Sequence, residues 1–247
     1  MKPIAYDKTY EFEESYWWFK GRRNIVFNLI KKYINYTNMG TIVDIGCGTG
    51  ITLKEISGFK LKIGIDESDI ALKYSNIRDC GQLIQGNVYK LPLDNCTADC
   101  ILLLDVLEHL DNEKKALDEI YRVSRDGCGI ILTVPSYKSL WSGEDEISLH
   151  KRRYIKKEIT NIIQSSGFIV ERITYFNLFL MPLIFFVINF NKIFNPKAMH
   201  ESDLKKLPKT LNYIFTYILY VESFLLNLVD LPFGASIVCV ARKKINL

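Results

Sequence analysis

The sequence lacks several features that would indicate particular classes of protein. Its 247 residues include six cysteines, none in Cys-x-x-Cys spacing, and three histidines, so we see no Cys/His cluster of the zinc-binding kind. The net charge of +4 is too small to indicate nucleic-acid binding. The first residues lack the basic-then-apolar order of a signal peptide. We therefore expect a cytoplasmic protein with buried thiols, no metal and no nucleic-acid partner.

Long uninterrupted apolar runs are also missing. The stretch Leu178–Phe190 is shorter than the roughly 20 residues that span a bilayer, and Pro182 and Asn189 interrupt it. The stretch Leu211–Leu231 is longer but contains polar and charged residues, and lysines lie between the two stretches, as suits a membrane surface. Residues 175–233 are therefore predicted to be a helical insertion. It can be a lid over an apolar substrate, a cap that faces a membrane or partner, or an ordinary layer covering the sheet.

What the sequence does contain is an alternation of short apolar runs with helical patterns, which predicts a parallel sheet with crossover helices. The expected strands are 41–45, 62–65, 83–85, 100–104, 128–134, 168–173 and 236–241. The expected helices are one that begins near Arg22, then 49–57, 68–80, 112–124 and 156–166, with Ser68 and Asp111 as N-caps and Gly167 as a C-cap. Residues 141–154 show no clear period.

A glycine-rich turn, Gly46–Gly50, follows the first predicted strand. Glycine lets the backbone approach a ligand closely, and the helix that follows presents free N–H groups. Asp66 lies twenty residues after Gly46, at the end of the second strand, where its carboxylate can hold both hydroxyls of a ribose or simply cap a helix. The NAD-binding motif G-x-G-x-x-G would place its third glycine where this sequence has Ile51. The turn therefore predicts a nucleoside cofactor other than NAD.

The run Val43–Gly50 resembles the first motif of the class I S-adenosylmethionine (SAM)-dependent methyltransferases, and more narrowly the methyltransferase type 11/12-like subgroup. Matches to the later motifs follow in the family's order at 64–66, 86–88 and 98–110, and the resemblance covers roughly residues 15–170 and 235–243. It implies a doubly wound, Rossmann-like α/β sheet of seven strands with the last antiparallel, here with the helical apolar insertion before that last strand. It also implies SAM as the cofactor.

The resemblance assigns cofactor-binding residues one by one. Asp44 is expected to orient the glycine turn and the methionine end of SAM, and Asp66 to bind the ribose. Asn87 stands where the family usually has an aspartate that accepts from the adenine amino group, so we expect an altered contact shared with the backbone of Val88. The remaining expected cofactor contacts are Gly46, Cys47, Gly48, Gly50, Glu67, Asp105 and Val106.

Residues 1–23 form an aromatic N-terminal segment. Its run Tyr16–Arg23 resembles a segment that folds over the cofactor in a subgroup of methyltransferases associated with polysaccharide or lipid biosynthesis. Trp17 can face the sulfonium cation, and Arg22 can pair with the methionine carboxylate. The alternative is that the aromatic residues pack on the sheet.

The acceptor site is predicted after the fifth strand, because ligands of this fold gather at the C-terminal ends of strands. His150 is the candidate general base, since an imidazole titrates near neutrality. The residues assigned to substrate binding are Trp141, Arg153, Tyr154 and His109. An exposed polar loop is the alternative interpretation of 141–154.

Together these features predict one methyltransferase domain over residues 1–247. It would move a methyl group from SAM to a small-molecule, glycan or lipid-linked acceptor, at oxygen, in the cytoplasm and with peripheral contact at the inner face of a membrane. The alternative is a non-catalytic SAM-binding module with a regulatory or assembly role. The sequence leaves the acceptor, the pathway and the oligomeric state open.

Overall fold

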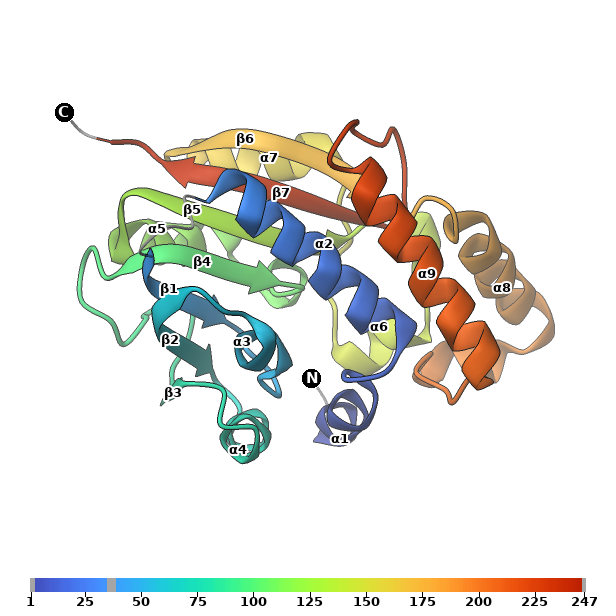
Figure 1. Ribbon diagram of the computed structural model, residues 1–247. Coiled ribbons are helices and arrows are strands. Elements are labelled where there is room, and N and C mark those ends of the chain that lie inside the picture. Colours follow the sequence, from blue (N-terminus) through green and yellow to red (C-terminus); the bar gives the residue numbers. More distant parts are fainter. Residues whose placement is uncertain (1–2, 35–38, 246–247) are drawn as a thin grey trace.

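A seven-stranded sheet forms the centre of the computed structural model, which describes residues 3–34 and 39–245 (Figure 1). The strand order is β3-β2-β1-β4-β5-β7-β6, and β7 runs antiparallel to both of its neighbours. This arrangement confirms the predicted doubly wound sheet with an antiparallel last strand. The strands are β1 Met39–Ile45, β2 Phe59–Asp66, β3 Gln82–Gln85, β4 Ala98–Leu104, β5 Ser124–Pro135, β6 Phe168–Phe176 and β7 Ser236–Lys243.

Helices cover both faces of this sheet. In Figure 1, α2 crosses the near face, while α5 and α7 lie behind the sheet. The α-helices are α1 Pro3–Phe12, α2 Trp17–Tyr33, α3 Ile51–Glu55, α4 Asp69–Ile77, α5 Glu113–Val123, α6 Gly143–Ser148, α7 Lys156–Ser165, α8 Met181–Phe194 and α9 Lys209–Leu225. The short 3-10 helices are η1 Leu107–His109, η2 Lys138–Leu140 and η3 Pro196–His200.

The core lies along β4 and β5, where the sequence has continuous apolar runs. The side chains of Ile101, Leu102 and Leu103 in β4 are fully buried, because helices cover both faces of a parallel sheet. Burying each such side chain contributes roughly 1.5–3 kcal/mol. The rigid strands therefore hold their C-terminal ends, at Leu104 and Pro135, in fixed positions beside the candidate site.

The first helix does not begin near Arg22 as predicted. It begins at Trp17, so only residues 17–23 of the aromatic segment form the first turns of α2, and a separate helix, α1, precedes it. The helix start is fixed by a contact that is distant in sequence. The backbone N–H of Trp17 donates to Oδ1 of Asn212 over 2.9 Å, and Nδ2 of Asn212 donates to the carbonyl of Ser15 over 2.8 Å.

Helix caps agree with the sequence in part. Ser68 caps α4 as predicted, by accepting a hydrogen bond from the backbone of Ala71. Asp111 does not cap α5, because the side chain of Asn112 takes that role and accepts from Lys115. The predicted helices 49–57 and 68–80 are shorter in the structure, and the C-cap of α7 is Ser166, followed by Gly167 at φ +88°.

The insertion before β7 consists of α8, η3 and α9, and α9 packs along α2. Within the described residues, no helix is long and apolar enough to span a membrane. Glu222 of α9 is fully buried and accepts hydrogen bonds from the backbone N–H groups of Asn177, Leu178 and Phe179 just after β6. This carboxylate therefore fastens α9 to the end of the sheet.

We expect Gly21→Ala to destabilise the packing of α2 on α9. A Cβ atom at Gly21 would lie 2.6 Å from Cβ of Leu219, which a side-chain rotation cannot move. The predicted loss is about 1–3 kcal/mol of unfolding free energy, measured by urea denaturation. In the double variant Gly21→Ala/Leu219→Gly, which removes the clashing Cβ atom, the two losses should be less than additive, whereas additive losses would contradict the close approach.

Candidate cofactor and acceptor site

One cavity of about 640 Å³ lies over the C-terminal ends of the parallel strands. It is continuous from the glycine turn to the insertion. Of the residues that the sequence predicted, the cavity is lined by Gly46, Gly48, Asp66, Glu67, Val88, Asp105, Val106, Trp17, Arg22, His109, His150 and Arg153. Sequence positions more than a hundred residues apart therefore meet around one space.

The glycine turn has the backbone shape that a close ligand contact needs. Gly46 and Gly48 have φ values of +72° and +56°, which favour glycine over other residues. A Cβ atom on Gly48 would meet nothing within 4 Å, so the backbone there borders open space. The N–H of Gly46 donates to the carbonyl of Ile65 over 2.7 Å, which fixes the turn against the end of β2.

Asp66 lies at the end of β2, beside this turn. One carboxylate oxygen accepts from the N–H of Gly48 over 2.9 Å, and the other accepts from the N–H of Ser68 over 2.9 Å. Burial raises the pKa of Asp66, against these two hydrogen bonds, which lower it. Each carboxylate oxygen has a second lone pair, so Asp66 can still accept from a ligand hydroxyl.

Asp44 lies under the turn and is almost fully buried, with Oδ1 lacking a hydrogen-bond partner. Burial raises the pKa of Asp44 to about 7, while Arg22 lowers it and Asp66 raises it further. Arg22 itself pairs with Asp105, which leaves its buried Nε without a partner. Arg22 lines the cavity, whereas Asp44 does not.

Asp105 stands at the exit of β4 in a left-handed conformation, with φ +58°. Such a conformation is uncommon for a residue with a side chain, and it is associated with functional sites. The hydroxyl of Thr133 donates to Oδ1 of Asp105 over 2.9 Å, and Arg22 pairs with the other oxygen. The carboxylate is therefore held in one orientation at the cavity wall.

Four predicted cofactor residues do not line the cavity: Asp44, Cys47, Gly50 and Asn87. Burial raises the pKa of the Cys47 thiol, as expected of a packed and unreactive cysteine. Asn87 donates to Glu67 over 3.0 Å, and its carbonyl oxygen accepts from the N–H of Tyr89. The amide oxygen that was expected to contact adenine thus already accepts one hydrogen bond within the protein, and one lone pair is left for a ligand.

Glu13 fastens the N-terminal segment over the glycine turn, and sequence reasoning gave it no such role. Its buried carboxylate accepts hydrogen bonds from the hydroxyl of Thr49 and from Arg78. Arg78 also donates to the carbonyl of Thr49 over 2.7 Å, and Arg23 donates to the carbonyl of Glu13. No local pattern could reveal these contacts, because they join residues 10 to 65 positions apart.

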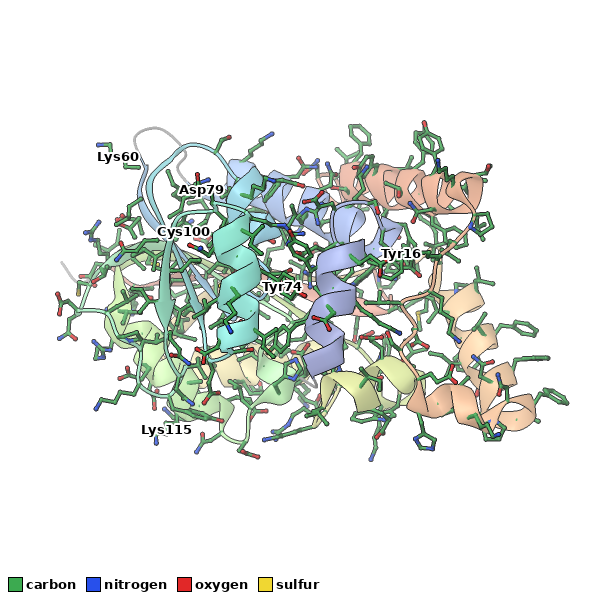
Figure 2. All side chains as sticks on the ribbon, turned by 90° about the horizontal axis from the view of Figure 1, so that it is seen from below. Tyr16, Lys60, Tyr74, Asp79, Cys100 and Lys115 are labelled. Carbon is green, nitrogen blue, oxygen red and sulfur yellow. The ribbon has the colours of Figure 1, made fainter. Side chains whose placement is uncertain are left out.

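The start of α2, just after the turn that follows α1, places aromatic residues in the wall of the cavity. Trp17 and Trp18 both line it, and the ring of Trp18 stacks on Phe176 at the end of β6, with centroids 5.6 Å apart. Figure 2 shows α1 beside α4, where Tyr74 lies; the ring of Tyr10 stacks on Tyr74 at 4.2 Å. The aromatic residues thus both face the cavity and pack on the sheet.

Asp145 organises the end of the cavity that was predicted to hold the acceptor. Its carboxylate accepts from Arg153 over 2.9 and 2.8 Å, and its Oδ1 lies 2.8 Å from Nδ1 of His150. It also accepts from the N–H of Ser142, which forms a capping box at the start of α6. Burial acts to raise the pKa of Asp145, but hydrogen bonds from His150 and Arg153 outweigh it and lower the pKa to about 2.

A second cluster lies beside Asp145 and includes Glu108, which the sequence analysis did not single out as a site residue. Glu108 is fully buried, and neither of its carboxylate oxygens has a hydrogen-bond partner among the described residues. Burial, and then the charge of Asp105, raise its pKa well above the usual range. Burial and the neighbouring His150 lower the pKa of His109 to about 4. The ring of His109 lies edge to face with that of His150, with centroids 4.7 Å apart.

Trp141 and Tyr154, predicted to bind substrate, lie away from the cavity. Nε1 of Trp141 donates to the exposed Glu146 over 2.7 Å. Tyr154 is buried, and its hydroxyl donates to Glu113 over 3.1 Å. Residues 141–154 are therefore not an irregular polar loop, because they contain α6. Only some of their side chains line the cavity.

The far end of the cavity is apolar and is formed by the insertion. Helix α8 contributes Leu183, Ile184, Val187 and Ile188. A second row of side chains on the same helix is exposed and aromatic: the rings of Phe186, Phe190 and Phe194 follow one another with centroids 6.1 and 4.8 Å apart. Helix α8 thus presents apolar side chains both to the cavity and to solvent.

The sheet order, the glycine turn and the acidic residue at the end of β2 define a nucleoside-binding protein of the Rossmann-like class. Comparison with known proteins narrows the class. A family model described as "Methyltransferase domain" matches residues 43–132. A Mycolicibacterium smegmatis protein named "Probable S-adenosylmethionine-dependent methyltransferase" is 25% identical over 163 residues, which cover 64% of this chain and 62% of that relative.

Solved structures agree with the fold. A Bacillus subtilis protein superposes with a TM-score of 0.60 at 14% identity, covering 91% of this chain and all of that one. A phosphoethanolamine N-methyltransferase from Haemonchus contortus, solved with S-adenosyl-L-methionine, gives a TM-score of 0.56 at 15% identity, covering 90% of this chain and 52% of that one. The family-model match and the relatives named SAM-dependent methyltransferases support a class I SAM-dependent methyltransferase.

We expect Asp145→Asn to lower the unfolding free energy by about 3 kcal/mol at neutral pH, because it leaves Arg153 without its buried partner. Since the folded pKa of about 2 lies below the ordinary value of 3.8, this stabilisation is present above pH 3.8 and is lost as the pH falls towards 2. Urea denaturation should show a smaller difference between the two proteins at about pH 3 than at neutral pH. The exposed Glu146→Gln is the control, and an equal loss in both variants would contradict the role of Asp145.

Proposed function

We propose that this protein transfers the methyl group of SAM to a small-molecule, glycan or lipid-linked acceptor, at oxygen. The observation that carries the proposal is the single cavity, which joins the glycine turn of the family's cofactor site to His150 and then to the apolar insertion. Methyl transfer from a sulfonium is an in-line displacement that depends mainly on alignment, and one shared cavity supplies it.

The cofactor end of the cavity suits a ligand with SAM's charges. Among the described residues, no arginine forms an ion pair with Asp66, and a carboxylate favours a nearby sulfonium cation. Gly48 offers backbone beside open space, and Asp66 can accept from the ribose hydroxyls. Arg22 lines the same end, where a guanidinium can pair with the methionine carboxylate.

The chain would work as one domain, with two covers over the cofactor. Residues 1–23 form one cover, held by the contacts of Glu13 with Thr49 and Arg78. Residues 175–233 form the other, held by Glu222. Trp17, which lines the cavity and is bonded to Asn212 of the insertion, joins the two covers.

At the acceptor end, His150 is the candidate catalytic residue. Its Nδ1 is held by Asp145, so its Nε2 is directed elsewhere, towards Glu108 at 3.9 Å. Arg153 and His109 also line this end and would contact the acceptor. An orienting carboxylate behind an imidazole is the arrangement that proton removal from a hydroxyl requires.

The exposed aromatic face of α8 supports a lipid-linked acceptor and peripheral contact at the inner face of a membrane. Phe186 and Phe194 have 65% and 70% of their surface exposed. Aromatic rings at this density, with Lys192 and Lys197 nearby, favour the interface of an anionic bilayer. Neighbouring side chains of α8 line the cavity, so an acceptor with an acyl or prenyl chain could enter from the lipid.

The first test is calorimetric titration with SAM and, separately, with NAD. We expect SAM alone to bind, and Asp66→Ala to weaken SAM binding about 100-fold through the loss of two hydrogen bonds to a charged group. The matched control is Asp69→Ala, an exposed aspartate at the start of α4.

A folded wild-type protein that fails to bind SAM would refute the proposed function. If SAM binds but S-adenosylhomocysteine never forms with lipid or glycan acceptors, the non-catalytic binding module would be favoured instead.

The membrane contact is tested by sedimentation with anionic phospholipid vesicles. We expect the wild type to sediment with them and the variant Phe185→Glu/Phe186→Glu to stay in solution, because each charge opposes insertion of α8. Ile77→Glu, at an equally exposed apolar position at the end of α4, should still bind. Absence of wild-type binding would contradict the membrane contact while leaving the SAM site untouched.

A further inference from the structure

We propose that Glu108, His109 and His150 bind a divalent transition-metal ion at the acceptor end of the cavity. Glu108 and His109 belong to η1, directly after β4, and His150 follows α6. All three side chains line the cavity. The inference rests on the proposed function and refines the part that His150 plays in it.

The ligand atoms are close enough for one ion. One atom from each of the three side chains lies within 4.8 Å of the other two, and Nε2 of His150 lies 3.9 Å from Oε1 of Glu108. Ligands held at about 2.1 Å from a shared ion lie roughly 3 Å apart. Small side-chain rotations therefore suffice to bring the three atoms around an ion.

The state of Glu108 supplies an independent reason for a ligand. Its side chain is fully buried and lines the cavity, and no residue in the described part of the chain forms a hydrogen bond with either carboxylate oxygen. The neighbouring carboxylates each have an arginine, since Asp105 pairs with Arg22 and Asp145 pairs with Arg153. A buried carboxylate without a partner is costly, and a cation is the ligand that satisfies it.

The surrounding contacts hold the three ligands in place. Asp145 holds Nδ1 of His150 at 2.8 Å, which leaves Nε2 to bind an ion, in the carboxylate–histidine–metal arrangement. The N–H of Lys151 donates to the carbonyl of Glu108 over 2.8 Å. This bond joins the segment that carries His150 to η1, so the distance between the two parts of the site is fixed by the backbone.

The chemistry of the donors selects the class of ion. Two imidazole nitrogens and one carboxylate oxygen suit Zn²⁺, Mn²⁺ or Fe²⁺, whereas Mg²⁺ and Ca²⁺ prefer oxygen ligands. Three protein ligands also leave coordination positions open, and here these positions face the cavity. Open positions are typical of an ion that contacts substrate.

An ion at this position would bind the hydroxyl of the acceptor and lower the pKa of that hydroxyl. The acceptor would lose its proton to water, since Nε2 of His150 would be occupied by the ion. The oxygen would then form a bond to the methyl carbon of SAM as the carbon–sulfur bond breaks, leaving the neutral thioether of S-adenosylhomocysteine. The substrate class that this site predicts is therefore a hydroxyl-bearing acceptor.

The test uses the full chain, stripped with a chelator, dialysed, and titrated calorimetrically with ZnCl₂ and separately with MnCl₂. We expect one equivalent to bind, and Glu108→Gln and His150→Ala each to weaken binding at least about tenfold. His109→Ala tests the third ligand and replaces Glu108→Gln if that variant fails to fold. The controls are His200→Ala and Glu146→Gln, which change exposed residues of the same two types.

Selective loss of metal binding in the three ligand variants would support the site. Wild-type protein that binds neither ion, or ligand variants that bind as tightly as the wild type, would overturn it. SAM titrations of the same preparations separate the two proposals. Failure to bind SAM refutes the proposed function, whereas normal SAM binding without a selective metal site refutes this inference alone.

Discussion

The cavity depends on one buried ion pair, in which the carboxylate of Glu13 receives hydrogen bonds from Arg78 and Thr49. Removing either partner would leave a buried charge uncompensated, at a cost of about 3–5 kcal/mol, so the start of the chain is confined to one position over the glycine turn. Glycine backbones are otherwise conformationally free. The ion pair therefore holds the glycine turn and the N-terminal segment in fixed positions around the cavity.

A second buried glutamate, Glu222, does the same for the other cover. Its carboxylate accepts hydrogen bonds from backbone N–H groups just after β6 and so fixes the position of α9. Helix α2 in turn packs against α9. The two covers also contact each other directly, because Trp17 donates to Asn212 and Lys206 pairs with Glu11 at 2.9 Å. Neither cover is complete alone, so changes in one are expected to alter the cavity wall formed by the other.

The sequence predicted the features that depend on neighbouring residues and missed those that depend on contacts between residues far apart in the chain. The continuous apolar runs of β4 and β5 specify buried strands, and the glycine turn with Asp66 lies where its spacing indicated. The start of α2 was misplaced because Asn212, almost two hundred residues away, fixes it.

The acceptor end was predicted less completely, for the same reason. Helix α6 was missed because it has no periodic pattern of apolar residues and is stabilised by a capping box instead. Glu108 was missed because it comes close to His150 only when the sheet folds. Asn87 and Tyr154 carried the expected residue types, but their polar groups are bonded to other parts of the protein. Pattern alone could not show which polar atoms remain free.

The distribution of arginines explains how the two ends of the cavity differ. Arg22 and Arg153 pair with Asp105 and Asp145, whereas Glu108 and Asp66 form no ion pair with an arginine among the described residues. Aspartates near the sulfonium stabilise bound SAM, but this stabilisation weakens as the methyl group leaves and the charge on sulfur disappears. The cation that we propose at Glu108 would act in the opposite sense. It would repel the sulfonium before transfer and not the neutral thioether afterwards, so its effect would favour the transition state over the bound cofactor.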